Sequence, residues 1–249
     1  MDTTPFDPAP RVLLFDLDDT LCDYETARAK RLRMAFSLGA DGATVERPGV
    51  DLEAMISDSI RTHPHAADHF VELFHRHGID DPAAARAAID WYRAHRFHGL
   101  RLFPDVADIL RSLRAFSPTT GERARRRFGV VTNGPADVQR AKIALLGVGD
   151  LVDFVVVSGE FGVAKPDPGI FQAALALAQA EPGDAVYVGD SPEFDIAGAQ
   201  AAGLRNVWVN RGGRAWDPSR PAPTREIRNI GDLPRIVGDW RENEDGGAN

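Results

Sequence analysis

Hydrophobic residues along this chain fall into two patterns that alternate over most of its length. Short apolar runs rich in Val, typical of buried parallel strands, are separated by segments whose apolar residues recur at helical spacing. The alternation predicts an α/β fold with a doubly wound, Rossmann-like parallel sheet. Strands are expected at 11–16, 128–133, 154–157, 185–190, 206–210 and 224–229, and helices at 104–116, 135–147, 168–180, 191–203 and 231–240.

The pattern changes between the first and second of these strands, where a long stretch has helical spacing and little β-branched alternation. Asp81-Pro82 is typical of a helix start, and Gly78 of a helix end. The stretch is too long for a structureless loop. We therefore expect a helical domain at 22–98, inserted into a core domain that comprises 1–21 and 99–249.

Composition narrows the range of functions. The 249 residues carry a formal net charge of −8 and a single cysteine, Cys22. The charge argues against binding to nucleic acid polymers or anionic membranes, and no apolar run is long enough to span a bilayer. One cysteine excludes an internal disulfide and suits a reducing compartment. The expectation is a cytoplasmic monomer or homodimer, with disordered ends at 1–10 and 241–249.

The first apolar run ends abruptly in acidic residues. Val12–Phe15 is followed by Asp16, Asp18 and Asp19, then Thr20. Open α/β sheets place their ligands at the carboxyl ends of the strands, so these acids are expected at a binding site. Carboxylates this close repel one another unless a cation joins them, and Mg²⁺ is a hard ion that prefers oxygen ligands.

Three later segments add polar groups near strand ends. Thr132 and Asn133 end the second strand, Lys165 precedes the helix at 168–180, and Asp190 follows the fourth strand, with Asp195 in the helix after it. Phosphoryl transfer accounts for this set, because a carboxylate can attack phosphorus while cationic and hydroxyl donors bind the phosphate oxygens.

A second carboxyl near the nucleophile can protonate the leaving oxygen and later activate water, and Asp18 is placed for this role. Asp190 supplies the metal with a carboxylate from another loop. Asp195, near a helix N-terminus, is expected to brace the metal's ligands.

These residues resemble the four motifs of the haloacid dehalogenase-like (HAD) hydrolase superfamily, in the family's order. The motifs match Asp16–Thr20, Thr132, Lys165-Pro166 and Gly189–Asp195. The resemblance implies that Asp16 is the nucleophile of an aspartyl-phosphate mechanism and Asp18 the general acid/base. It further implies Mg²⁺ held by Asp16, the Asp18 backbone carbonyl and Asp190, and phosphate binding by Thr132 and Lys165. The insert looks like the family's helical C1-type cap.

The resemblance also indicates which reaction to expect. Members that break carbon–halogen bonds generally lack an acid at position 18, so Asp18 favours a Mg²⁺-dependent phosphomonoesterase acting on a small phosphorylated metabolite. The flanks of the first and fourth motifs resemble those of pyrimidine-5′-nucleotidases and sugar-phosphate phosphatases. The alternatives are a 2-haloacid dehalogenase, a phosphoacceptor signalling domain and a catalytically inactive binding protein.

Several further residues have competing interpretations. Asn133 is a candidate phosphate ligand or a plain turn residue, and Asp19 is expected to be structural. The histidines His63, His65 and His69 are read as a solvated helix face rather than a second metal site. Cys22 is read as packing where the insert begins, and the arginines at 123 and 125–127 as an exposed basic run.

Overall fold

A computed structural model describes residues 4–63, 66–115 and 125–238. Contacts between Cα atoms divide the chain into two compact units. Unit 1 comprises residues 1–22 and 102–249, and unit 2 is Asp23–Arg101. The expected boundaries, between 21 and 22 and between 98 and 99, lie one and three residues from these limits.

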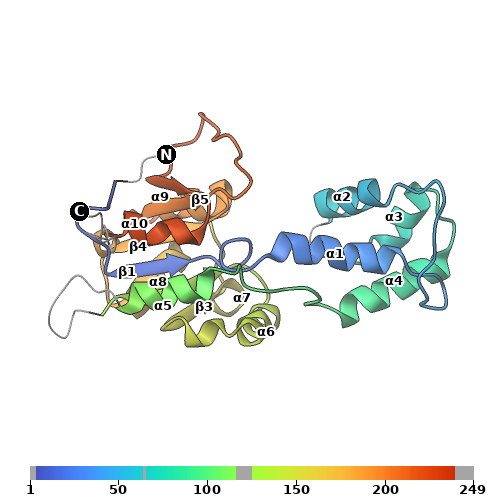
Figure 1. Ribbon diagram of the computed structural model, residues 1–249, viewed down its shortest axis with the longest axis horizontal. Coiled ribbons are helices and arrows are strands. Elements are labelled where there is room, and N and C mark those ends of the chain that lie inside the picture. Colours follow the sequence, from blue (N-terminus) through green and yellow to red (C-terminus); the bar gives the residue numbers. More distant parts are fainter. Residues whose placement is uncertain (1–3, 64–65, 116–124, 239–249) are drawn as a thin grey trace, which may run out of the picture. The chain divides into compact units, whose positions relative to one another are not determined.

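A six-stranded parallel sheet forms the centre of unit 1, in the order β3-β2-β1-β4-β5-β6. Figure 1 shows strands of this sheet with helices around them. The doubly wound α/β fold expected from the alternating pattern is confirmed. The strands are β1 Val12–Phe15, β2 Arg127–Thr132, β3 Phe154–Val157, β4 Ala185–Gly189, β5 Arg205–Val209 and β6 Arg225–Ile227.

The strand β1 lies between β2 and β4, where the order of the sheet reverses. In the aligned register, Phe15 pairs with Val130 on one side and with Val188 on the other. The chain segments that leave β2, β1 and β4 at their carboxyl ends are therefore neighbours. This is the switch point at which open α/β sheets bind ligands.

Helices cover both faces of this sheet. Leu14 packs in a buried cluster with Phe171 on one face, whereas Arg114 lies over the ring of Phe128 on the other. Unit 1 contains α5 Val106–Ala115, α6 Ala136–Leu146, α7 Ser158–Phe161, α8 Pro168–Ala178, α9 Ala197–Ala201 and α10 Leu233–Ile236.

Unit 2 is helical, as the sequence pattern predicts. Phe36, Phe70 and Phe74 form its aromatic core, with ring centroids 4.7 and 5.8 Å from that of Phe36. Asp51 and Asp81 cap α2 and α4 by accepting hydrogen bonds from backbone N–H groups. The helices are α1 Tyr24–Phe36, α2 Leu52–Thr62, α3 Phe70–Arg76 and α4 Pro82–Ala94.

The structure corrects several of the sequence-based expectations. Residues 4–10 are ordered against unit 1, because Phe6 is buried and its N–H donates to the carbonyl of Ile236. Ser158–Phe161, expected as a loop, forms the short helix α7. Arg126, expected to be exposed, is 1% exposed and donates to backbone carbonyls, among them that of Pro10. His69, expected on a solvated face, is buried.

Some expectations fall on segments outside the described residues. These are His65, Arg123 and the terminal tail at 241–249. Among the helices that are described, none is long and apolar enough to cross a membrane.

Candidate active site

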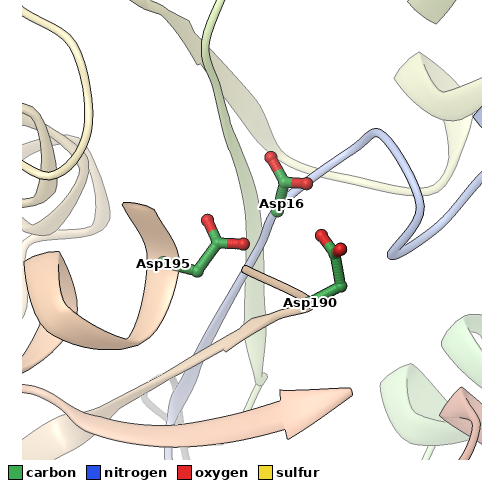
Figure 2. A group of neighbouring side chains, drawn as sticks. All are labelled: Asp16, Asp190 and Asp195. Carbon is green, nitrogen blue, oxygen red and sulfur yellow. The ribbon is translucent and has the colours of Figure 1, made fainter. Parts of the chain in front are cut away.

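Three carboxylates meet at the carboxyl ends of β1 and β4 (Figure 2). Asp16 directly follows β1, Asp190 directly follows β4, and Asp195 lies in the π-helical turn Pro192–Ile196. Each offers one oxygen, and these three oxygens all lie within 4.8 Å of one another. The sequence places these acids up to 179 positions apart, and parallel pairing of the two strands brings them together.

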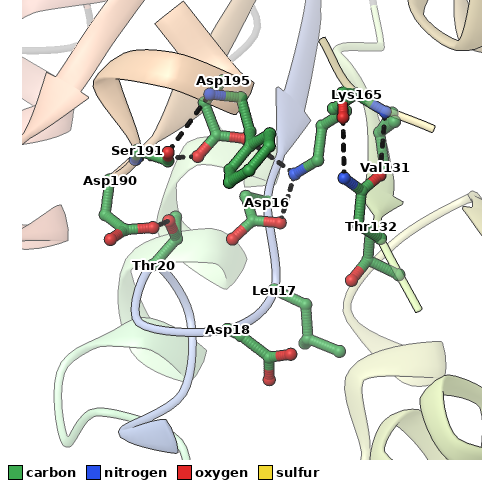
Figure 3. A network of polar contacts seen from close by, with 12 residues as sticks. Asp16, Leu17, Asp18, Thr20, Val131, Thr132, Lys165, Asp190, Ser191 and Asp195 are labelled. Atoms are coloured by element: carbon green, nitrogen blue, oxygen red, sulfur yellow. Dashed lines mark hydrogen bonds and ion pairs between the residues drawn. The ribbon is translucent and has the colours of Figure 1, made fainter. Parts of the chain in front are cut away.

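Lys165 joins two of these acids (Figure 3). Its ammonium donates to Oδ1 of Asp16 at 2.5 Å and to Oδ1 of Asp195 at 2.7 Å, and it is 4% exposed. Burial lowers the pKa of Lys165, but the attraction of the two carboxylates is stronger, so its net pKa is raised and the ammonium stays charged. Oδ2 of Asp16 takes no part in this pair.

The acid cluster carries more negative charge than Lys165 balances. Burial and the neighbouring carboxylates Asp195 and Asp18 raise the pKa of Asp16 to about 7, although Lys165 opposes the shift. Burial, then Asp195 and Asp16, raise the pKa of Asp190 to about 8. Three carboxylates facing one ammonium leave a surplus of two negative charges when all are ionised, which is the charge that a divalent cation neutralises.

Asp195 is held by groups from three directions. Oδ1 accepts from the Tyr187 hydroxyl at 3.0 Å, in addition to Lys165, and Oδ2 accepts from the Ser191 N–H at 2.9 Å. Gly189 makes room for it, because an added Cβ would lie 2.5 Å from the Asp195 carboxyl carbon. Asp195 is therefore fixed in place within the acid cluster, whereas the sequence-based expectation gave it only a supporting role around the metal.

Asp190 is fixed mainly through its backbone. Its carbonyl accepts from the Trp208 indole N–H at 2.9 Å and from the Arg214 guanidinium at 3.1 Å. The Thr20 hydroxyl lies 3.5 Å from Oδ1 of Asp190. Thr20, the last residue of the first motif, thus braces the acid supplied by the fourth.

Thr132 and Asn133 end β2 beside this cluster. Thr132 is 1% exposed, and its hydroxyl accepts from the Gln139 amide at 2.5 Å. Both ends of the Asn133 amide pair with the Lys165 backbone at 2.9 Å, donating to its carbonyl and accepting from its N–H. The Asn133 side chain therefore holds the loop that carries Lys165, and its contact with phosphate stays a prediction.

Asp18 points to a separate set of donors. Its Oδ2 accepts from the Lys142 ammonium at 2.6 Å and from the Gln139 amide at 3.3 Å. The buried Cys22 thiol lies 3.6 Å from Oδ1 of Asp18, and burial raises the pKa of this thiol. Asp18 does not belong to the group of three close carboxylates, so only its backbone carbonyl stays a predicted metal ligand.

The donor set fits Mg²⁺. Asp16, Asp190 and Asp195 offer close carboxylate oxygens, the ligands that this ion prefers, and the surplus charge equals that of a divalent ion. Soft ligands are absent from this group, because the Cys22 thiol contacts Asp18 instead. Asp16 and Asp190, the carboxylates expected from the sequence, both belong to this group, and Asp195 is a further candidate ligand.

Three site residues were missed by the sequence reasoning: Gln139, Lys142 and Tyr187. Tyr187 is the one hydroxyl-bearing residue in the apolar run Ala185–Gly189. Gln139 and Lys142 are polar residues three apart on α6, so they share a helix face, and both are buried. A polar residue inside an apolar strand is the signal that could have found Tyr187. The pattern of α6 gives no such signal for Gln139 and Lys142, because Leu145 of the same helix is exposed.

Comparisons with known proteins agree with the fold. The model of the haloacid dehalogenase-like hydrolase family matches residues 10–203. A glyceraldehyde 3-phosphate phosphatase of Methanopyrus kandleri is 34% identical over 81% of this chain and 84% of its own length. An N-acylneuraminate-9-phosphatase of Mus musculus is 30% identical over 91% of this chain and 93% of its own.

Solved structures share the fold over nearly the whole chain. The 2-haloacid dehalogenase of Pseudomonas syringae pv. Tomato DC3000 is 31% identical, with a TM-score of 0.58 over 93% of this chain and 100% of its own. The magnesium-bound HAD hydrolase YfnB of Bacillus subtilis is 23% identical, with a TM-score of 0.68 over 92% of this chain and 99% of its own.

The curated relatives named here are phosphatases, and they support a phosphoric monoester hydrolase. The family match spans the strands that carry Asp16, Thr132 and Asp190. The expectation drawn from the four sequence motifs is confirmed: this chain belongs to the haloacid dehalogenase-like hydrolase family.

Proposed function

We propose that this protein is a Mg²⁺-dependent phosphatase that hydrolyses the phosphomonoester of a small metabolite through an aspartyl-phosphate on Asp16. One observation carries the proposal. Two buried acids, Asp16 and Asp195, bind the buried ammonium of Lys165, and the half-buried Asp190 lies beside them. Asp16 keeps one oxygen clear of the ammonium. A phosphate ester beside these acids needs a divalent cation, and the bound ion would neutralise charge on the phosphate oxygens.

In the first step, Oδ2 of Asp16 attacks phosphorus while Oδ1 stays bound to Lys165. The ester P–O bond breaks, and the leaving oxygen takes a proton from the Asp18 carboxyl. The Thr132 hydroxyl accepts a hydrogen bond from Gln139, so its own hydrogen is available to a phosphate oxygen. Lys165 keeps Asp16 oriented and adds positive charge beside the phosphate.

In the second step, water attacks the phosphorus of the aspartyl-phosphate. The Asp18 carboxylate takes the water proton, the bond between phosphorus and Oδ2 of Asp16 breaks, and inorganic phosphate leaves. Asp16 returns as a carboxylate and Asp18 as a carboxyl, so the cycle is closed. The acid that served the leaving group in one step serves as the base in the next.

Unit 2 is proposed as the cap that selects the substrate. Its helical composition and its place in the chain, directly after the first motif, support this role. Relatives acting on glyceraldehyde 3-phosphate and N-acylneuraminate 9-phosphate direct attention to phosphorylated sugars and sugar acids. Nucleotides are a further class to test, because the motif flanks resemble those of pyrimidine-5′-nucleotidases.

A phosphate-release screen tests the proposal. The purified protein is assayed with Mg²⁺ against an aryl phosphate, sugar phosphates, phosphorylated sugar acids and nucleotides. We expect turnover that EDTA abolishes and that Asp16→Asn lowers by at least about 10³-fold, because the nucleophile is lost. A folded protein that hydrolyses none of these esters, or an Asp16→Asn variant with undiminished turnover, contradicts the proposal.

A 2-haloacid dehalogenase is the second candidate, because the 31% identical structure bears that name. Halide leaves without a proton, so that reaction gives the Asp18 carboxylate, with its paired Lys142, no role in the leaving-group step. Halide release from 2-chloropropionate in the presence of EDTA would favour this candidate. We expect none above the rate without enzyme.

A further inference from the structure

The helix α6 presents two buried donors to Asp18 and Thr132. Lys142 is 4% exposed and Gln139 is 1% exposed, and they lie three residues apart on the same helix face. Lysine is almost never this buried unless its ammonium is paired. The acid to which Lys142 donates is Asp18, at 2.6 Å.

The Gln139 amide links Asp18 to Thr132. Its Nε2 donates to the Thr132 hydroxyl at 2.5 Å and lies 3.3 Å from Oδ2 of Asp18. One amide therefore fixes the distance between the proton-transferring acid and a phosphate-binding hydroxyl.

The two oxygens of Asp18 are consequently unequal. Oδ2 accepts from an ammonium and an amide, whereas Oδ1 lies 3.6 Å from the Cys22 thiol, which is a weak donor. Oδ1 is the oxygen left to exchange a proton with the reacting group. Holding Oδ2 fixes the direction in which Oδ1 points.

We propose that Lys142 and Gln139 are positioning residues that hold Asp18 through Oδ2 for the hydrolysis of the aspartyl-phosphate. This inference rests on the proposed function, because it assigns the pair to one of its two steps. An ammonium donor stabilises a carboxylate, so the pair favours the step that begins with Asp18 as a carboxylate. That step is the second one, in which Oδ1 takes the proton from water.

The consequence is specific to one step. Removing Lys142 leaves the Asp18 carboxylate less well oriented and less stabilised, and both changes slow the attack of water. In the first step Asp18 begins as a carboxyl, a form that the nearby ammonium disfavours. Removing the ammonium therefore helps this step and offsets the poorer orientation of Asp18. Lys142→Met should therefore lower kcat and KM together and leave kcat/KM nearly unchanged, because kcat/KM reports steps only through formation of the phosphoenzyme.

The experiment measures steady-state kinetics and the phosphoenzyme together. The whole protein is mixed with Mg²⁺ and a ³²P-labelled phosphomonoester found in the screen, quenched in acid during turnover, and the protein-bound label is counted. For Lys142→Met we expect kcat and KM about 10- to 100-fold lower than in wild type, and a phosphoenzyme fraction that rises to most of the enzyme.

The control on the same helix is Arg140→Met, which removes an exposed cation paired with Glu160 and should behave as wild type. Lys142→Gln, which keeps a donor without the charge, serves if the Met variant fails to fold and should show the same pattern. Gln139→Met should lower kcat/KM as well as kcat, because Thr132 also loses its donor.

The outcomes separate the two proposals. If wild type carries label and folded Lys142→Met and Lys142→Gln carry the same amount, the positioning role is overturned. The proposed function then remains intact. A fall in kcat/KM equal to the fall in kcat, without extra label, also overturns it, because that is the pattern of general damage. Turnover with no label at any quench time, in wild type and in both Lys142 variants, contradicts the aspartyl-phosphate itself.

Discussion

Lys165 and Asp16, 149 residues apart in the sequence, are joined by a hydrogen-bonded ion pair of 2.5 Å at the switch point of the sheet. The pair forms because Asp16 follows β1 while the Asn133 amide, at the end of β2, holds the backbone of Lys165. Both side chains are buried, and an ion pair in such surroundings is stronger than the same pair in water.

Replacement of Lys165 is therefore expected to disable the enzyme. Lys165→Met removes the cation from between Asp16 and Asp195, leaving their mutual repulsion unopposed. We expect kcat to fall by about 10²- to 10³-fold, the range seen when one charged or hydrogen-bonding stabiliser of a reaction is lost. Lys30→Met, which removes an exposed lysine of α1, is the matched control and should keep wild-type kcat. Near-normal turnover by a folded Lys165→Met protein would refute this role.

The hydroxyl of Tyr187 is expected to support both stability and activity. It lies 3.0 Å from Lys165 and from Asp195, and 3.2 Å from the Val131 carbonyl. Tyr187→Phe keeps the ring that packs against Phe171 and removes only this hydroxyl. We expect the free energy of unfolding in urea to fall by about 1–2 kcal/mol and kcat to fall several-fold. Unchanged stability and kcat would show that the hydroxyl contributes nothing.

Magnesium is expected to stabilise the folded protein through the acid cluster. Binding to the folded state alone raises the midpoint of thermal unfolding as the concentration of the ion increases. Asp190→Asn removes one carboxylate of the cluster, so the shift caused by Mg²⁺ should shrink markedly, and activity with it. Asp217→Asn, at an exposed loop residue, should keep the full shift. An undiminished shift in Asp190→Asn would place the ion elsewhere.

His69 makes unit 2 sensitive to acid. Burial, together with His63 and Arg28, lowers the pKa of His69 to about 4, and its Nε2 lies 2.9 Å from the Ser59 hydroxyl. In the unfolded chain His69 binds a proton near pH 6.5, whereas in the folded protein it does so only near pH 4. Protons therefore stabilise the unfolded chain, and the free energy of unfolding decreases as the pH falls from about 6.5 towards 4.

The change in unfolding free energy with pH tests this assignment. Between about pH 7.5 and 5, His69 should account for about 2 kcal/mol of the loss in stability. His69→Gln keeps a hydrogen-bonding partner for Ser59. Over the same pH interval its free energy of unfolding, measured in urea, should fall by that much less than in wild type. His75→Gln, at an exposed position of α3, should show the wild-type dependence. Equal dependence in wild type and His69→Gln would assign the acid sensitivity to other groups.

Residues at strand ends could be predicted from the sequence because each directly follows an apolar run. Asp16, Thr132 and Asp190 are found in this way, and the parallel register of β2, β1 and β4 then brings them together. The same reasoning predicts the α/β fold, since period and composition decide which segments are buried.

Residues inside elements escaped prediction, because periodicity does not reveal what a buried polar group contacts. Tyr187 lies within β4. Lys142 lies within α6, and a lysine in a helix is normally expected to be exposed to solvent. Arg126 belongs to a run of arginines that was expected to be exposed. Its burial depends on hydrogen bonds to backbone carbonyls that are distant in sequence, such as that of Val237. Only the folded chain brings such partners together.

The identity of the nucleophile is the claim on which the mechanism depends, and chemical trapping tests it most directly. During turnover of the substrate with Mg²⁺, borohydride is added to reduce any acyl phosphate, and the tryptic peptide spanning residues 12–28 is sequenced by mass spectrometry. We predict homoserine at position 16, with Asp18 and Asp19 unmodified and no conversion when substrate is omitted. Efficient turnover with position 16 still aspartate, or reduction at another carboxylate, would contradict the account.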